Sequence, residues 1–309
     1  MSDLETPTQF IEQYLTEVVN DFNEKGCQQL FTPENADLLS KAIVNLSLGT
    51  HTSNWCRMSS IGKPSILTAV NKLKQDFGQS LEHDESDDIN SPRMQSLFLW
   101  GNVFEEWLIL IGERLGWWKV VSQQQELAIP CDNGAVITGH IDAVLECPEG
   151  QFVLEVKTLS PNYHRTFVKS PNDDRGYLTQ LAMYSDCTKL PGFWLALDKG
   201  SGCLSVVNLP SYADERIERA LKITNHVSKL TTIEEVVTTV PVPPPVEEIF
   251  KRKPTGRYLL PDSMKFYEYA DIFYVLENDS NGYKKDTVYV ADYREHAEVI
   301  DLLTQRLTS

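Results

Sequence analysis

The chain has 309 residues, of which 41% are hydrophobic and 10% aromatic, so it can bury at least one sizeable core. Its 16 Gly, 16 Pro and 23% charged residues exclude collagen-like, low-complexity and disordered classes. No apolar run approaches the roughly 18 residues of a membrane helix, and the N-terminus lacks the basic, apolar start of a secretory signal. The six cysteines form no C-x-x-C pair. We therefore expect a cytoplasmic protein with reduced thiols and no membrane contact.

The formal net charge of −16 argues against a protein that coats nucleic acid without specificity, because such proteins carry a basic face. The charge is unevenly distributed, however, and three windows between residues 38–75, 156–172 and 249–261 contain no acid. Their cations include Lys41, Arg57, Lys63, Lys72, Lys74, Lys157, Arg165, Lys169, Lys251, Arg252, Lys253 and Arg257. Local basic strips on an acidic body suit a site that admits a polyanion, although ordinary solvated charge explains them equally well. The last window could contact DNA or only solvate a loop.

The first part of the chain has helical spacing. Apolar residues recur every three or four positions over residues 10–22, and further helices are predicted over 34–47, 64–77 and 92–115. Residues 49–64 are typical of a loop. The acidic stretch 78–92 is typical of a connection.

The pattern then changes to strands over 120–129, 135–145 and 152–158, with turn signals at Asn133-Gly134 and Pro148–Gly150. A helix over 173–186, strands over 193–197 and 204–209 and a helix over 212–229 complete a mixed α/β core with a central mixed sheet flanked by helices. Prolines within 241–245 predict an extended connector. Beyond it we expect an aromatic segment, a strand near 287–291 and a terminal helix. The predicted regions are 1–56, 57–240 and 241–309.

The chemistry is concentrated on the second and third strands. Asp142 and Glu155 can be neighbours if these strands form a hairpin, and Glu155 and Lys157 share a face because they are two residues apart. Two carboxylates and a lysine make a divalent-cation site plausible, since Mg²⁺ prefers oxygen ligands. An exposed cross-strand ion pair is the alternative.

Two helices add candidates. Glu105 follows Gly101 by one turn on the long apolar helix, although periodicity alone does not choose between Glu105 and Glu106. Gln180 and Tyr184 share a face of the helix after the strands. A surface acidic pair and a half-buried amphipathic helix are the respective alternatives.

Four segments, taken in their order and spacing, resemble the motifs of the PD-(D/E)XK nuclease superfamily. They are Gly101-x-x-x-Glu105, Gly139-His140-Ile141-Asp142, Glu155-Val156-Lys157 and Gln180-x-x-x-Tyr184. More narrowly they resemble its RecB-like and lambda-exonuclease-like branch, over about residues 57–210. The resemblance implies a restriction-endonuclease-like core. It also implies Mg²⁺ or Mn²⁺ held by Glu105, Asp142, Glu155 and the Val156 carbonyl.

The resemblance implies a role for each further residue. Lys157 would position or activate the attacking water, Gln180 would orient the site or the DNA, and Tyr184 would face the substrate. The segment containing Arg57, Ser59, Ser60 and Lys63 is similar to the one that opens the nuclease core in related proteins, and its hydroxyls and cations suit a phosphate. A plain helix cap and turn is the alternative there. Arg165 and Lys169 are further candidate DNA contacts.

Some RecB-like nucleases hold a [4Fe–4S] cluster with one cysteine before the core and three after it. The chain has no cysteine beyond Cys203, so we expect no iron–sulfur cluster of that layout.

These features predict a Mg²⁺-dependent deoxyribonuclease with DNA as its partner. The branch favours an exonuclease on linear duplex ends that leaves 5′ phosphates, in phage-type recombination or DNA processing within a bacterial or phage-infected cell. A homo-oligomer or a recombination partner protein is possible. The alternatives are a structure-specific or restriction-type endonuclease of the same fold and a non-catalytic DNA-binding module.

Overall fold

The computed structural model describes residues 5–25, 40, 54–79, 92–131, 134–265, 267, 269–277 and 288–308. The predicted helix over 34–47 lies outside the described residues apart from Ser40. The acidic connection lies outside them beyond Gln79. Both remain predictions.

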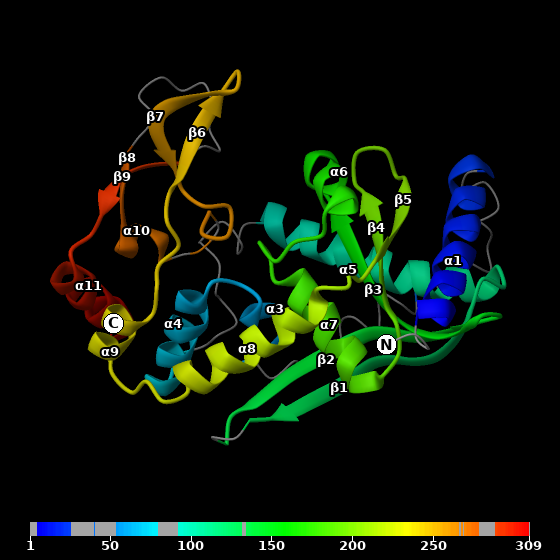
Figure 1. Ribbon diagram of the computed structural model, residues 1–309, viewed down its shortest axis with the longest axis horizontal. Coiled ribbons are helices and arrows are strands. Elements are labelled where there is room, and N and C mark those ends of the chain that lie inside the picture. Colours follow the sequence, from blue (N-terminus) through cyan, green and yellow to red (C-terminus); the bar gives the residue numbers. More distant parts are fainter. Residues whose placement is uncertain are drawn as a thin grey trace.

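In the described part of the first 240 residues, groups of consecutive helices are followed by groups of consecutive strands (Figure 1). The helices are α1 (Glu5–Lys25), α3 (Met58–Ile61), α4 (Ser65–Asp76), α5 (Pro92–Arg114), α6 (Pro161–Lys169), α7 (Tyr177–Thr188), α8 (Ala213–Val227), α9 (Ile233–Thr239), α10 (Ala270–Phe273) and α11 (His296–Thr308). The strands are β1 (Lys119–Pro130), β2 (Val136–Cys147), β3 (Gly150–Leu159), β4 (Gly192–Asp198), β5 (Leu204–Asn208), β6 (Val246–Phe250), β7 (Lys253–Leu259), β8 (Tyr274–Glu277) and β9 (Tyr289–Tyr293).

The central sheet has five strands in the order β1-β2-β3-β4-β5. Neighbouring strands are antiparallel except β3 and β4, which are parallel and connected through α6 and α7. A parallel pair needs such a crossover, because a tight turn can join only antiparallel strands. The predicted mixed α/β fold with a mixed sheet between helices is confirmed.

Both faces of the sheet are covered at β3 and β4, whereas no residue of β1 is fully buried. On one face α1 and α5 pack with Phe152, Leu154 and Phe193, whereas α3, α4, α7 and α8 cover the other face around Val153 and Trp194. Burial on both sides explains why β3 and β4 carry near-continuous apolar runs.

Helix α1 also binds the free edge of the sheet. Asn23 donates to the carbonyl of Leu204 at 2.9 Å, and its Oδ1 accepts from the Leu204 amide at 3.0 Å. The side chain therefore satisfies backbone groups that an edge strand leaves unpaired.

Four helices differ from the sequence prediction. Part of the predicted loop over 49–64 forms the single turn α3, and α6, α9 and α10 were not predicted. Two of the missed helices, α6 and α9, have recognisable starts. Pro161 occupies the first turn of α6, and Thr232 and Glu235 form a capping box at α9.

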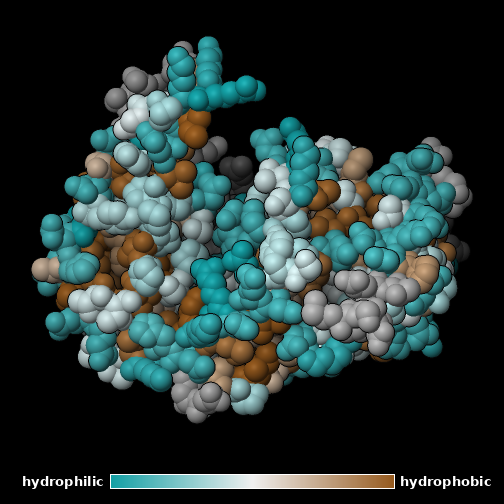
Figure 2. Space-filling model, viewed as in Figure 1, coloured by the Kyte–Doolittle hydropathy of each residue, from teal (hydrophilic) through white to brown (hydrophobic). Residues whose placement is uncertain are grey.

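The C-terminal part contains a second sheet in the order β6-β7-β9-β8, of which only the strand near β9 was predicted. The C-terminal part shares one apolar cluster with the core. Met264, Phe273 and Leu303 belong to the same cluster as Ile66 and Val70 of α4. Residues 241–245 form neither helix nor strand, as their prolines predict. Figure 2 shows the surface hollowed between this part and the body that carries the central sheet.

Within the described ranges, no helix combines the length and apolarity needed to cross a membrane.

Candidate active site

Asp142 and Glu155 lie opposite one another where β2 and β3 separate. The two strands pair from Cys147–Gly150 up to Ala143–Leu154, and the next opposed positions in this register are Asp142 and Glu155. No backbone pairing is formed there. Instead, the backbone N–H of Val156 donates to Oδ2 of Asp142 at 2.8 Å. The predicted neighbourhood of the two acids is therefore present.

The strand alternation breaks at Asp142. Ile141 belongs to the apolar cluster on one face of the sheet and Ala143 to the cluster on the other, although residues two apart normally share a face. The break directs the Asp142 carboxylate into the space left by the separating strands, where it is only 9% exposed.

Lys157 reaches back along β3 to Glu155. Its ammonium group forms an ion pair and hydrogen bond with Oε1 of Glu155 and lies 4.8 Å from the ring centroid of Tyr177 on α7. Burial lowers the pKa of Lys157, but the charges of Glu155 and Asp142 outweigh this effect and raise it above its ordinary value. Lys157 is therefore protonated at neutral pH.

The structure distinguishes Glu105 from Glu106. The charge of Glu105 acts on Asp142, and Glu105 itself experiences the charges of Glu155 and Lys157. Oε1 of Glu105 accepts from Gln124 at 2.9 Å. Glu106 is buried and accepts from Gln123 at 3.3 Å. Glu105 is thus the acid that belongs to the site.

Gln124 was not predicted as a site residue. It is opposite Asp142 on β1, between the paired positions Gln123–Ala143 and Gln125–Ile141, and its φ of 49° is in the left-handed region. Such a backbone is uncommon for a residue with a side chain and is often retained at functional sites. Three consecutive glutamines within a strand were the available sequence signal. Tyr177, beside Lys157, was also missed, and it lies one helical turn before Gln180.

Burial raises the pKa values of all three carboxyl groups, and the charges of neighbouring acids add to this effect at Glu105 and Asp142. Burial and then the charge of Glu155 raise the pKa of Glu105 to about 7, against the opposing effect of Lys157. Burial, Glu105 and Glu155 raise the pKa of Asp142 well above its ordinary value. Burial raises the pKa of Glu155 as well, despite the nearby Lys157. Acids arranged this way hold excess negative charge that a cation would relieve.

The donor set fits a hard cation by its chemistry. Oε2 of Glu155 is buried with no hydrogen-bond partner, and buried carboxylate oxygens normally have one. Among the described residues, however, no three His, Cys, Asp or Glu side chains are grouped as metal ligands. The internal donors Gln124, Lys157 and the Val156 amide each hold one carboxylate oxygen, so cation binding would require side-chain rearrangement.

Gln180 and Tyr184 lie beside the acids but are buried. Gln180 Nε2 donates to the Tyr184 hydroxyl at 2.9 Å, and Tyr184 is 2% exposed. The Tyr184 ring packs against Gly139, where an added Cβ would lie 2.8 Å from Cε1. Tyr184 is thus buried and fixes Gln180, and its predicted role of facing the substrate stays a prediction.

The predicted phosphate segment lies on α3 and its flanks. Arg57, Ser59, Ser60 and Lys63 are half-buried, and α3 is a single turn of four residues. So short a helix offers no N-terminal anion site, and any phosphate contact would come from the side chains.

The segment is fixed to the start of α7, because a Cβ on Gly176 would lie 2.6 Å from the Ser59 carbonyl oxygen. Its position is therefore set by the same helix that carries Gln180. The other predicted DNA contacts, Arg165 and Lys169, are exposed on α6.

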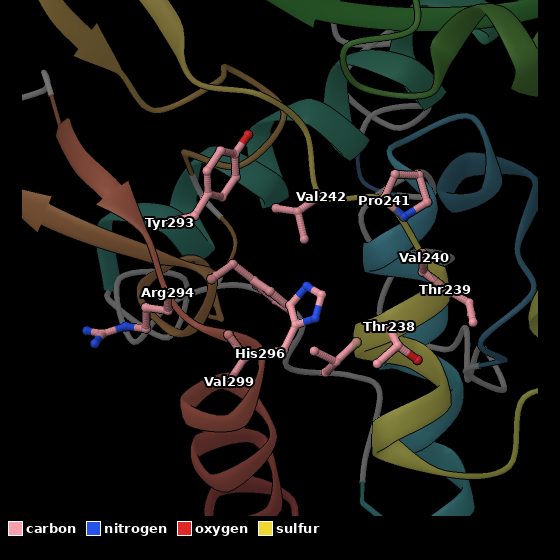
Figure 3. A pocket seen from close by; sticks show the side chains of 11 residues that line it. Thr238, Thr239, Val240, Pro241, Val242, Tyr293, Arg294, His296 and Val299 are labelled. Atoms are coloured by element: carbon pink, nitrogen blue, oxygen red, sulfur yellow. The ribbon is translucent and has the colours of Figure 1, made fainter.

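A cavity of about 410 Å³ lies elsewhere, between α9, the Pro-rich connector and α11 (Figure 3). The imidazole of His296 points into it between Thr238 and Val242, whereas Arg294 points away. None of the candidate site residues lines this cavity.

Comparisons with known proteins assign no family. No family model and no curated protein match the chain. One solved structure, titled "Crystal structure of SSO0001", is similar at a TM-score of 0.39 and 13% identity, over 68% of this chain and 94% of that one. A functional assignment therefore depends on the side chains described above.

Proposed function

We propose that the protein is a metal-dependent DNA nuclease that hydrolyses phosphodiester bonds inside the cell. The observation that carries this proposal is the junction of β2 and β3, where Asp142 and Glu155 face each other, Lys157 adjoins them and Oε2 of Glu155 has no partner. Glu105 approaches from α5 and adds a third carboxylate. The four residues match the acidic and lysine positions of the PD-(D/E)XK motifs.

The cation would be Mg²⁺ or Mn²⁺, held by Glu105, Asp142, Glu155 and the Val156 carbonyl. When bound, it would neutralise phosphate charge and lower the pKa of the attacking water. Lys157 is buried, and in the metal-free site the charges of Glu155 and Asp142 raise its pKa above the ordinary value. Its role is to donate a hydrogen bond to the attacking water or a phosphate oxygen and to stabilise the charge that develops there. Gln180, fixed by Tyr184, orients the site or the DNA.

Substitution of the two central groups tests the assignment. Asp142→Asn retains an oxygen acceptor for the Val156 amide, and Lys157→Ala removes the ammonium group. We expect each to lower the rate of Mg²⁺-dependent DNA degradation by at least about 100-fold, the typical effect of removing one electrostatic contact. The matched controls are Asp186→Asn and Lys189→Ala. These two residues form an exposed ion pair at the C-terminal end of α7.

Circular dichroism and the thermal midpoint would verify that each variant folds. Full activity in both folded site variants would refute the proposal. Activity of the unmodified protein in excess chelator would refute its metal dependence.

Exonuclease action on linear duplex ends with 5′-phosphate products is the more specific form of the proposal, and it rests on the resemblance to the RecB-like and lambda-exonuclease-like branch. Time-resolved digestion of end-labelled linear DNA beside covalently closed circles tests it, because a closed circle offers no end. Cleavage of the circle would instead support a structure-specific or restriction-type endonuclease. A non-catalytic DNA-binding module would bind DNA but cleave neither substrate.

A further inference from the structure

The turn and second strand of the β6–β7 hairpin are rich in cations. Residues 249–261 contain four cations and no acid, whereas the start of β6 carries Glu247 and Glu248 and the whole chain a net charge of −16. The cations are Lys251, Arg252, Lys253 and Arg257. The proposed catalytic chemistry uses none of them, so their concentration here needs a separate explanation.

The hairpin exposes apolar side chains beside these charges. Ile249 is 69% exposed, Phe250 61% and Tyr258 47%, and apart from Glu248 and Leu259 every residue of the two strands is exposed. A two-stranded hairpin with no buried face contributes little to a core. Exposed aromatic rings among cations instead match the surfaces that bind nucleic acid, where rings stack on bases and cations contact phosphates.

The turn of the hairpin has an unusual backbone. Phe250 pairs with Lys253, so Lys251 and Arg252 form a two-residue turn, and their φ values of 49° and 66° are both left-handed. Turns of this type favour Asn and Gly, because a side chain is disfavoured at positive φ. Two long cations at this turn oppose local preference, as is expected where side-chain chemistry matters more than local stability.

The base of the hairpin is fixed while its tip projects. The Arg257 guanidinium lies 3.4 Å from the ring centroid of Tyr289 on β9, and Glu248 accepts from both Thr255 and Tyr289 at 3.2 Å. Figure 1 shows the hairpin extending from the C-terminal part at the same end of the molecule as α6, which carries the exposed Arg165 and Lys169. The hollow of Figure 2 lies between the two elements, with long hydrophilic side chains projecting from the hairpin.

We propose that the β6–β7 hairpin binds the DNA substrate outside the candidate active site, with Lys251, Arg252 and Lys253 on phosphates and Phe250 stacked on an unpaired base. Charge complementarity favours a polyanion, and the ring at the turn favours a single-stranded segment or a frayed end over an intact duplex. This inference deepens the proposed function, since it presupposes a DNA substrate.

Binding of a labelled single strand, measured by fluorescence anisotropy with the full chain in chelator, tests the inference. We expect the triple variant Lys251→Ala, Arg252→Ala and Lys253→Ala to lose at least about 10-fold in affinity at moderate salt. The slope of log affinity against log salt should fall by about 2, because each phosphate contact on a single strand contributes about 0.7. Phe250→Ala should lose about 5-fold or more without a change of slope, because base stacking does not release counterions.

The matched control removes three exposed lysines elsewhere, Lys189, Lys222 and Lys229, and should bind DNA within about twofold of the unmodified protein. Equal DNA binding by the hairpin variant and the unmodified protein would overturn the inference. The inference would also be overturned if the hairpin variant lost binding to anionic lipid vesicles but kept its DNA binding. That result would indicate that the hairpin binds a membrane surface.

The two proposals fail separately. Cleavage of DNA with binding that does not depend on the hairpin would leave the nuclease assignment standing and refute the inference. DNA binding that depends on the hairpin, without cleavage, would support the inference and refute the nuclease assignment. Absence of DNA binding by the unmodified protein would overturn both.

Discussion

Each acidic side chain of the candidate site is held by a donor from the chain itself. Gln124 binds Glu105, the Val156 amide binds Asp142, and Lys157 binds Glu155. These contacts fix one oxygen of each carboxylate. They leave three acids against one lysine, so the site remains net negative when all four groups are ionised. Its affinity for a cation therefore depends on groups outside the ligand set.

Gln124→Ala should weaken the site without removing a ligand. Loss of the hydrogen bond that lowers the pKa of Glu105 should shift the acidic limb of the pH–rate profile to higher pH and reduce the affinity for Mg²⁺ by about 10-fold or more. Gln123→Ala is the matched control, because Gln123 is the adjacent glutamine and binds Glu106 instead. Metal titrations of activity at several pH values would measure both effects, and an unshifted profile would contradict the positioning role.

The raised pKa of Glu105 predicts a pH dependence of stability. A carboxyl group with a pKa near 7 when folded and about 4.3 when unfolded binds more protons in the folded state between these values. Stability in chelator should therefore rise as the pH falls from 8 to 6, with about 1 kcal/mol from Glu105. Glu105→Gln should remove that part of the rise. Denaturant unfolding of both proteins at the two pH values measures the difference, and parallel curves would contradict the prediction.

The proximity of Asp142 and Glu155 could be predicted from sequence, because a short turn fixes the register of two neighbouring strands. The pairing of Cys147 with Gly150 confirmed this reasoning. Gln124 and Tyr177 could not be predicted in the same way. Gln124 depends on a left-handed backbone, and Tyr177 on the packing of a helix against β3. Neither feature has a periodic signal.

At the scale of elements, α3 and α7 approach each other so closely that two glycines are required. A Cβ on Gly62 would lie 2.8 Å from the Gly176 Cα, and Gly176 has a φ of +77° with the Ser59 carbonyl nearby. The contact connects the segment with the candidate phosphate ligands to the helix that carries Gln180.

Gly176→Ala should destabilise the protein by about 2–4 kcal/mol, because a left-handed alanine and a backbone clash both contribute. Gly202→Ala isolates the first effect, since Gly202 has a φ of +76° with nothing within 4 Å of an added Cβ. That control should cost about 1–2 kcal/mol. Chemical denaturation would measure both losses. If both variants lost the same free energy of unfolding, the close contact between α3 and α7 would contribute little to stability.

The long elements of the core were predictable because their apolar residues keep one period over several turns or positions. Helices α6 and α9 were missed for a different reason. Both are short, and their signals lie at their starts, at Pro161 and at the Thr232–Glu235 capping box. The strands β6 and β7 carry almost no burial, so no alternation could reveal them.

At the scale of the whole molecule, one apolar cluster joins the C-terminal part to α4 and α8. Gln79 after α4 donates to the carbonyl of Leu307 at 2.8 Å, and Lys74 of α4 lies over the ring of Tyr269. The predicted boundary at residue 241 thus crosses a continuous core. We expect the two sides of that boundary to unfold together.

Leu303→Ala tests this coupling. All six tryptophans precede residue 195, so tryptophan fluorescence reports only on the body that carries the central sheet. Leu303 is fully buried in the C-terminal part, and its truncation should lower the unfolding free energy seen by fluorescence by about 2–5 kcal/mol. Leu276→Ala, at a position 36% exposed, should cost less than about 1 kcal/mol. A fluorescence transition unmoved by Leu303→Ala would show that the C-terminal part unfolds independently.

The hydrogen bond between the Val156 amide and Asp142 limits which residues position 142 can accept. The side-chain oxygen of Asp142 accepts a hydrogen bond from the Val156 amide. Without it, this buried amide would have no partner where β2 and β3 separate. Asparagine at position 142 would keep this bond and the architecture, whereas an aliphatic residue would leave the Val156 amide unpaired. Glu155 and Lys157 bond each other rather than the main chain, so replacing both together would leave no backbone group unpaired.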